Sequence, residues 1–225
     1  MNKDHIKRYV FGFPNSNMYV IAENGSALVI DPNISNDALI YMNSNNVDKV
    51  TVLLTHEHYD HTSGLAWLTS HFDCTVICHE QTAVSLKTGR NNRPALIALS
   101  KKDEFPKERV MEILRELPQG FFCEPDITFN DEYGFEWGEH RIKMISCPGH
   151  SPGSCCIELD DDTVATGDSL ILNTPVITRF PGGSEEEFRN KTLGYLEGLS
   201  DDAYILPGHG ETFYMKEERQ RHEKN

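Results

Sequence analysis

The strongest chemical signal in this sequence is the segment His56–His61, which has the pattern H-x-H-x-D-H. It follows directly after a run of apolar, β-branched residues, so it begins where a buried strand is expected to end. Side chains at alternate positions of an extended segment point the same way, so His56 and His58 can reach one metal ion. Asp60 and His61 then lie within reach of a second metal on the adjoining turn. Imidazoles and carboxylates are ligands that zinc binds, so the segment predicts a metal centre.

Three later segments have the same form, in which a strand-like run ends at a residue that can bind a metal. They contain His150 in C-P-G-H-S, Asp168 in T-G-D-S and His209 in P-G-H-G. A glycine beside each residue lets the backbone adopt tight or positive-φ conformations and approach a metal closely. Each segment is a weak signal alone, but together with the histidine pattern they complete a set of candidate ligands.

The elements that must position these residues alternate between strand-like and helical patterns. Two apolar β-forming runs on either side of Asn24-Gly25 predict an N-terminal hairpin. Ser184 is a plausible N-cap for a helix whose first turn contains three glutamates. This alternation predicts an α/β layered fold. The expected strands cover residues 49–55, 75–79, 135–147, 154–159, 163–168 and 203–210, and the expected helices cover residues 36–46, 65–72, 80–87, 107–117 and 184–199.

Polar and charged residues dominate from about residue 88 to 130, around one amphipathic helical pattern. This stretch is too short to bury a core of its own, so we expect a single domain, residues 1–225, with a partly helical insertion that covers one end. Basic side chains in the insertion could meet an anionic substrate, although charged positions are more often simply solvated. They are Arg90, Arg93, Lys101 and Lys102.

Composition and charge narrow the classes of function. The chain has 225 residues, and its 35 acidic and 21 basic residues give a formal net charge of −14. Such a surface repels phosphate backbones, so no nucleic-acid partner is expected. No apolar run approaches the roughly 18 residues that span a bilayer, and no secretory signal is visible, so no membrane partner is expected. The six cysteines then predict reduced thiols, mostly in the core, and a cytoplasmic location.

Taken in order, H-x-H-x-D-H, P-G-H-S, T-G-D and G-H resemble the metallo-β-lactamase superfamily, and more closely its compact glyoxalase II-like (hydroxyacylglutathione hydrolase-like) hydrolases. The resemblance covers nearly the whole chain. It implies a single-domain αββα sandwich with two metals at one edge, between the two sheets. It also implies that His56, His58 and His150 hold one metal, that Asp60, His61 and His209 hold the other, and that Asp168 bridges them.

Differences between this sequence and the motifs of related families narrow the choice of family. Flavodiiron reductases carry H-x-E-x-D-H, whereas this chain has His58 at the Glu position. The tRNA-processing nucleases of the superfamily share the histidines, but an acidic chain suits RNA poorly. Glyoxalase II proteins grip glutathione with a C-terminal helical domain, and only 16 residues follow His209. The stretch Thr178–Ser184 matches the loop G-R-T-D-x-P-G-G-D of compact relatives only in part, so the substrate-binding residues stay unassigned.

The implied centre suits hydrolysis. Two divalent metals, best zinc though iron or manganese also fit, would lower the pKa of a shared water, and the resulting metal-bound hydroxide would attack an acyl carbonyl. A thiol leaves as thiolate with little help, whereas an amine or alkoxide needs a proton donor. We therefore predict a dinuclear metal-dependent hydrolase of a small-molecule or carrier-bound acyl thioester. Its catalytic residues would be Asp168 and Asp60, the latter a candidate proton donor; the oligomeric state is not predicted.

Other activities fit parts of the same pattern. A lactone or β-lactam hydrolase would use the same centre. A persulfide dioxygenase would hold a single iron with the positions of His56, His150 and Asp168. A metal-binding protein without catalysis would also need these ligands. Metal analysis, together with a screen of substrates, separates these alternatives.

Two residues near His150 have a second interpretation. Ser151 fits the G-x-S-x-G pattern of serine hydrolases, with Asp168 and His209 following in triad order. That pattern requires a helix directly after the serine, and a strand-like run follows instead. Cys147, three residues before His150, could line the site, but a buried structural thiol is the more common case.

Overall fold

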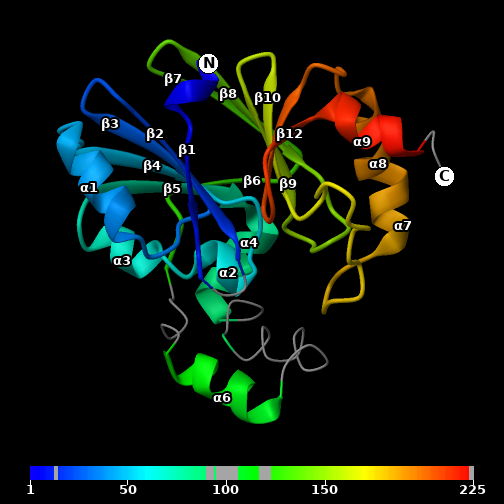
Figure 1. The fold of residues 1–225 in the computed structure, drawn as a ribbon, viewed down its shortest axis with the longest axis horizontal. Helices are drawn as coiled ribbons and strands as arrows, with labels where there is room; N and C mark the ends of the chain where they lie inside the picture. Colours follow the sequence, from blue (N-terminus) through cyan, green and yellow to red (C-terminus); the bar gives the residue numbers. More distant parts are fainter. Residues whose placement is uncertain (13–14, 90–93, 95–105, 117–122, 223–225) are drawn as a thin grey trace.

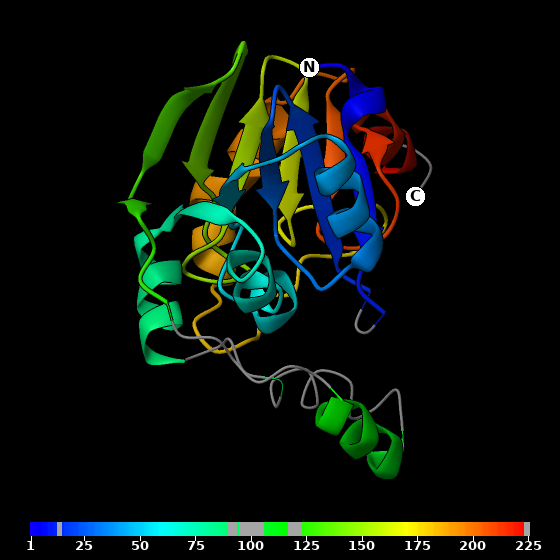
Figure 2. The same ribbon diagram turned by 90° about the vertical axis from the view of Figure 1, so that its left-hand side faces the viewer.

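The computed structural model describes residues 1–12, 15–89, 94, 106–116 and 123–222, and within them two six-stranded sheets lie face to face (Figures 1 and 2). The first sheet has the order β1 (Lys7–Val10), β2 (Asn17–Glu23), β3 (Ser26–Ile30), β4 (Lys49–Leu53), β5 (Asp73–His79) and β6 (Ile127–Phe129). The second has the order β12 (Phe213–Tyr214), β11 (Tyr204–Pro207), β10 (Thr163–Gly167), β9 (Cys155–Leu159), β8 (His140–Ser146) and β7 (Glu132–Trp137).

Helices cover the outer face of each sheet, which confirms the expected αββα sandwich (Figures 1 and 2). The first sheet is covered by α1 (Asn36–Ser44), α3 (Leu65–Thr69) and α4 (Glu80–Thr88). The second is covered by α7 (Glu185–Glu187), a π-helical turn (Phe188–Thr192), α8 (Leu193–Gly198) and α9 (Met215–His222). A short 3-10 helix (Lys3–His5) begins the chain, and α2 (Tyr59–Thr62) follows the end of β4.

Strand β2 shows how the layers form. Its side chains alternate between the two faces of the sheet. Met18 and Val20 pack into the core beneath the outer helices, whereas Tyr19 and Ile21 pack into the core between the sheets. All four are at most 2% exposed. A strand buried on both faces reads as a continuous apolar run, which is the pattern its sequence shows.

The chain direction in each sheet brings the candidate ligands to one edge. Asn24 and Gly25 have positive φ of 50° and 78°, and they join β2 and β3 in the predicted hairpin. Strands β3, β4, β5 and β6 then run parallel, as do β10 and β11 in the second sheet. Loops that follow parallel strands leave the sheet at a common edge, which is where open α/β sheets place their ligands.

The structure corrects two expected boundaries. Residues Ile127–Phe129, placed in the insertion by the sequence, form β6 and pair with β5, so the insertion ends before them. The helix expected over residues 184–199 forms, and the Ser184 side chain accepts a hydrogen bond from the amide of Glu187, but a π-helical turn interrupts it.

The predicted helix of the insertion also forms, as α6 (Lys107–Glu116). It stands apart from both sheets, at the end of the molecule where α2 lies (Figures 1 and 2). Its role as a substrate cover stays a prediction. The four basic residues named in the insertion lie outside the described residues. Within the described part of the chain, none of the helices is long and apolar enough to cross a membrane.

Candidate metal centre

The segment His56–His61 is fixed by a carboxylate at the end of the neighbouring strand. Asp31, which follows β3, accepts hydrogen bonds from the Thr55 amide at 2.7 Å and from the Thr55 hydroxyl at 2.6 Å. The chain then runs extended through His58 and turns into α2 at Tyr59. Asp31 therefore holds the point at which β4 ends and the histidine segment begins.

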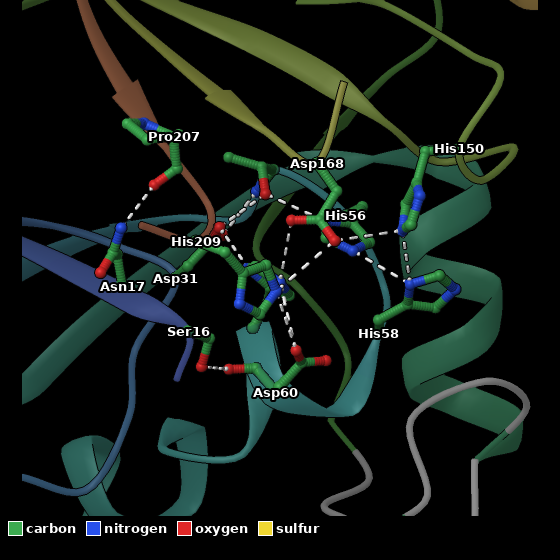
Figure 3. Close-up of polar contacts among 12 residues, drawn as sticks. Ser16, Asn17, Asp31, His56, His58, Asp60, His150, Asp168, Pro207 and His209 are labelled. Atoms are coloured by element: carbon green, nitrogen blue, oxygen red, sulfur yellow. Dashed lines mark hydrogen bonds and ion pairs between the residues drawn. The ribbon is translucent and has the colours of Figure 1, made fainter. Parts of the chain in front are cut away.

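Three histidines form the first cluster, which Figure 3 shows beside Asp168. His58 Nδ1 lies 3.1 Å from His56 Nε2 and 2.9 Å from His150 Nε2. The nitrogen ligands of a tetrahedral zinc ion, each about 2.0–2.1 Å from the metal, stand roughly 3.3 Å apart. His56 and His58 come from the loop after β4 and His150 from the loop after β8, so both sheets contribute to the cluster.

Asp60, His61 and His209 form the second cluster, the loop after β11 supplying His209. Asp60 Oδ2 lies 3.5 Å from His61 Nε2 and 3.3 Å from His209 Nε2. The Asp60 backbone is held in turn, because its carbonyl accepts a hydrogen bond of 2.8 Å from the Ser16 hydroxyl (Figure 3). This cluster therefore combines imidazoles with a carboxylate, unlike the first.

Asp168 lies between the two clusters, directly after β10. Its Oδ2 is 3.5 Å from both His150 Nε2 and His209 Nε2, and its Oδ1 is 3.5 Å from His61 Nε2. Glycine keeps the space open: a Cβ at Gly208 would collide with Asp168 Oδ1 and lie 2.8 Å from His61 Cε1. The structure thus brings together all seven residues that the sequence singled out.

Hydrogen bonds on the far side of four histidine rings leave the Nε2 atom of each ring for the centre. In each, Nδ1–H donates outward: His150 to the Ile177 carbonyl at 2.8 Å, His209 to the Asn15 carbonyl at 3.2 Å. His61 donates to Asp31 at 2.9 Å, and His56 to the Thr55 hydroxyl at 3.1 Å. These partners orient each ring with Nε2 toward the centre, as they do in metal sites.

Two buried atoms have no hydrogen-bond partner among the described residues and face each other across the centre. They are His61 Nε2 and Asp168 Oδ1. They lie 3.5 Å apart as an ion pair. A buried polar atom without a hydrogen bond is costly, and these two are an imidazole nitrogen and a carboxylate oxygen, both good ligands for a divalent cation. The donor set and its geometry therefore fit two metal ions, and the same groups form the candidate clusters His56/His58/His150 and Asp60/His61/His209.

The two clusters differ in the protonation of their metal-free forms. Burial, reinforced by His150, lowers the pKa of His58 to about 3, and burial also holds the pKa of His56 well below its usual value. In the second cluster burial is outweighed by carboxylates. Asp60 and Asp168 raise the pKa of His61 to about 9, and Asp168 raises that of His209 to about 11.

The same contacts between carboxylates and imidazoles also change the pKa values of the two aspartates. Against the effect of burial, His61 and His209 lower the pKa of Asp60 to about 2 and hold that of Asp168 well below its usual range. Both therefore carry negative charge at neutral pH. In the first cluster, His56 and His58 are therefore neutral imidazoles, whereas the second cluster is a network of ion pairs.

Three residues that support the second cluster, Asp31, Ser16 and Asn17, were assigned no functional role from the sequence. Asn17 Nδ2 donates to the carbonyl of Pro207 (Figure 3) and to that of Gly210, both at 2.9 Å, on either side of His209. Asp31 could have been predicted from the sequence. It is an acidic residue at the end of β3, which runs parallel to β4, so it must lie at the same edge of the sheet as the histidine segment. Ser16 and Asn17 had no such signal, because the groups they hold lie 44 and about 190 positions further along the chain.

The serine-hydrolase alternative is wrong. Ser151 is fully buried and donates its hydroxyl to Glu57 at 2.8 Å, while His209 Nε2 faces Asp60 and Asp168. Strand β9 follows this serine, not a helix. Cys147 is likewise a core residue: it is fully buried in the apolar cluster beneath the helices of the second sheet.

An aromatic ring lies at the first cluster. In the partly matched loop Thr178–Ser184, the ring of Phe180 meets the rings of His58 and His150 edge-on, with centroids 5.5 and 5.7 Å apart. The carbonyl that fixes His150 comes from Ile177, just before this loop. The loop thus both positions a candidate ligand and places an apolar side chain beside it.

Known proteins resemble the chain over most of its length. A family model described as the metallo-beta-lactamase superfamily matches residues 11–209. The "Probable metallo-hydrolase YqgX" of Bacillus subtilis is 25% identical over 217 residues, 95% of this chain and 94% of that one. The "Hydroxyacylglutathione hydrolase GloC" of Haemophilus influenzae is 28% identical over 188 residues, 82% of this chain and 80% of that one. The structure of the BLEG-1 B3 metallo-beta-lactamase matches the fold with a TM-score of 0.74, covering 96% of each chain at 23% identity.

Proposed function

Because residues 11–209 match its family model, the chain belongs to the metallo-beta-lactamase superfamily, and we propose that it is a dinuclear metal-dependent hydrolase that cleaves acyl thioesters. The observation that carries the proposal is the assembly of seven ligand-type residues from both sheets around Asp168. A single metal would need only one of the two clusters, and here both are complete.

The residues divide into two ligand sets that share one carboxylate. His56, His58 and His150 would hold one divalent cation, Asp60, His61 and His209 the other, and Asp168 would bridge them. When bound, such cations polarise a substrate carbonyl and make water a nucleophile near neutral pH. Zinc suits this mixture of imidazole and carboxylate best, and iron or manganese fit the same donors.

The chain's own groups hold and orient the reacting parts. Asp31 and the Ile177 carbonyl fix the rings of His61 and His150, so the open side of the centre faces the substrate with little reorganisation. The carboxylate oxygens of Asp60 and Asp168 can accept a proton released from water during attack, and we assign the two residues this catalytic role.

The choice of a thioester follows from the leaving group. A thiol with a pKa near 8.5 leaves as thiolate without a proton, whereas an alkoxide or amine needs an acid. Asp60 and Asp168 have pKa values held low, so neither is protonated at neutral pH to act as that acid. The similarity to GloC, a hydroxyacylglutathione hydrolase, supports the same substrate class. We propose a small-molecule or carrier-bound acyl thioester in the cytoplasm, with neither nucleic acid nor membrane as partner.

The test combines metal analysis with a substrate panel. The purified protein is loaded with Zn²⁺, Fe²⁺ or Mn²⁺ and assayed on acyl-glutathione, acyl-CoA, acyl-carrier-protein thioesters, lactones and β-lactams. We expect about two metals per chain, thioester hydrolysis exceeding the other reactions, and loss of activity with a chelator.

Other outcomes would replace the proposal. One iron per chain with oxygen uptake on glutathione persulfide would identify a persulfide dioxygenase. Preferred cleavage of lactones or β-lactams would keep the centre and change the substrate. A fully metallated protein inactive on every substrate would be a metal-binding protein without this catalysis.

A further inference from the structure

The residue between the first two histidines is buried, and the metal centre does not use it. Glu57 is 0% exposed. Since the segment is extended here, its side chain points away from the side taken by His56 and His58. Its Oε2 accepts a hydrogen bond of 2.8 Å from the Ser151 hydroxyl and lies 3.5 Å from the Thr82 hydroxyl of α4. Its Oε1 has no hydrogen-bond partner among the described residues.

The turn that carries His150 is built onto this carboxyl group. Ser151 directly follows His150, and its amide and hydroxyl both contact Ser154 Oγ, at 3.1 and 2.9 Å. At Gly153 a Cβ would lie 2.6 Å from Glu57 Oε2 and would collide with the Thr82 hydroxyl. The Gly153 carbonyl instead accepts a hydrogen bond of 3.1 Å from that hydroxyl. The turn therefore packs directly against Glu57, with no room for a side chain between them.

This contact joins the two parts of the chain that form the first cluster. His56 and His58 keep their spacing through the local backbone, but His150 belongs to the other sheet and must be brought to them. The Glu57–Ser151 hydrogen bond spans 94 positions in the sequence. It connects Glu57, which lies between His56 and His58, to Ser151, which follows His150. The Ile177 carbonyl fixes the ring of His150, whereas Glu57 restrains its backbone.

Burying a carboxyl group is costly, and here one oxygen gains no hydrogen bond in return. The group is therefore better explained by what it positions than by what it adds to stability. We infer that Glu57 is a positioning residue that, through Ser151, holds the His150 turn at the distance from His56 and His58 that metal binding requires. The inference rests on the proposed metal centre.

Zinc affinity of the intact protein tests the inference without any assay of turnover. Dissociation constants for Zn²⁺ are measured by competition with a chromophoric chelator, in a His209→Ala background that leaves only the first cluster complete. Glu57→Ala and Ser151→Ala should each weaken zinc binding by about 10- to 100-fold, the usual range for residues that orient ligands. The double variant should bind zinc no more weakly than the weaker single variant, because both changes remove one hydrogen bond.

Two further variants separate positioning from stability. Glu57→Gln keeps an oxygen that accepts from Ser151, so its zinc affinity should stay within about threefold. Leu86→Ala opens a cavity in the fully buried core beneath α4, so it should lower Tm and leave zinc affinity unchanged. If Glu57→Ala does not fold, Ser151→Ala removes the same hydrogen bond with little change in volume.

The outcomes are distinct. Unchanged zinc affinity in Ser151→Ala, additive losses in the double variant, or an equal loss in Leu86→Ala would each overturn the role of Glu57. A wild-type protein that binds no zinc, iron or manganese would instead refute the metal centre itself.

Discussion

The two ligand clusters lie side by side but are built from different chemistry. The first contains three imidazoles, and burial keeps His58 neutral, with a pKa of about 3. The second contains Asp60 with two imidazoles, and carboxylates raise the pKa values of His61 and His209 to about 9 and 11. Without metal, His56 and His58 of the first cluster are neutral imidazoles, whereas the second cluster is a set of ion pairs.

The group behind one histidine of each cluster differs in the same way, although His209 of the second cluster also donates to a backbone carbonyl. His150 of the first cluster donates to a backbone carbonyl, while His61 of the second donates to the carboxylate of Asp31. A carboxylate behind an imidazole makes it a stronger base and a stronger ligand, but also a better acceptor for a competing proton. Metal binding at the first cluster therefore depends mainly on the geometry of its imidazoles, whereas metal binding at the second depends mainly on the charges of its carboxylates.

The largest effect is expected where the clusters meet. Asp168→Ala removes the only side chain in the described site that contacts His61, His150 and His209 together, so turnover should fall roughly 1000-fold or more. Initial rates on the preferred thioester measure it. The control is Asp161→Ala, whose side chain is 84% exposed on the β9–β10 hairpin and which should keep wild-type turnover. A rate near wild type for Asp168→Ala would show that the clusters act separately.

Removing one ligand from each cluster tests whether the clusters are independent. His58→Ala and His209→Ala should each reduce the metal content from about two to about one per chain, because each leaves the other set of ligands intact. Metal analysis after gel filtration gives the count, and hydrolysis should drop in both variants. If either substitution empties both sites, the comparison between two clusters fails and the centre binds metals as one unit. Unchanged hydrolysis by metal-poor His58→Ala would contradict the proposed mechanism.

A change behind the second cluster should leave the first unaffected. Asp31→Asn keeps the shape and an acceptor for the Thr55 amide but loses the charge behind His61, so the second cluster should bind metal about 10- to 100-fold more weakly. Chelator competition in the His58→Ala background isolates that cluster. Asp37→Asn, an exposed change in α1, serves as the control. Equal losses at both clusters would mean that Asp31 acts only through the Thr55 backbone.

Acidification should empty the second cluster before the first. A raised pKa means that a proton binds more tightly, so protons compete with metal at His61 and His209 at a higher pH than at His58. His58→Ala retains the second cluster, and His209→Ala retains the first. We expect His58→Ala to lose half of its metal at a pH about one to two units higher than His209→Ala does. Dialysis at a series of pH values followed by metal analysis measures this. The reverse order would show that the carboxylates favour metal over protons.

Local patterns account for much of the fold. The Asn24-Gly25 turn, the N-cap at Ser184 and the continuous apolar runs of β2 and β4 follow from residues close together in the sequence. The structure differs where distant segments decide the outcome. Ile127–Phe129 reads as part of a polar insertion and becomes a strand only because β5 offers an edge for it. The π-helical turn at Phe188–Thr192 has no sequence signal that we recognise.

In the candidate site, too, some residues could be predicted from the sequence and others only from contacts between distant segments. Residue types and spacing alone identified the seven ligand-type residues, because few side chains bind metals and each follows a strand with a glycine or a short turn beside it. Most of the partners that orient them could not be predicted: Asn17 and the Glu57–Ser151 pair act through contacts between segments 94 to about 190 positions apart.

The sequence by itself therefore determined the chemistry of the site, since the donor atoms are properties of the residues. Only the tertiary structure decided the protonation of each ligand and the contacts that orient it. Burial and the distances between charges set those properties, and both arise when the two sheets pack together. His58 and His61 are three residues apart, yet their pKa values move in opposite directions. Burial, reinforced by His150, lowers the pKa of His58, whereas Asp60 and Asp168 outweigh burial at His61.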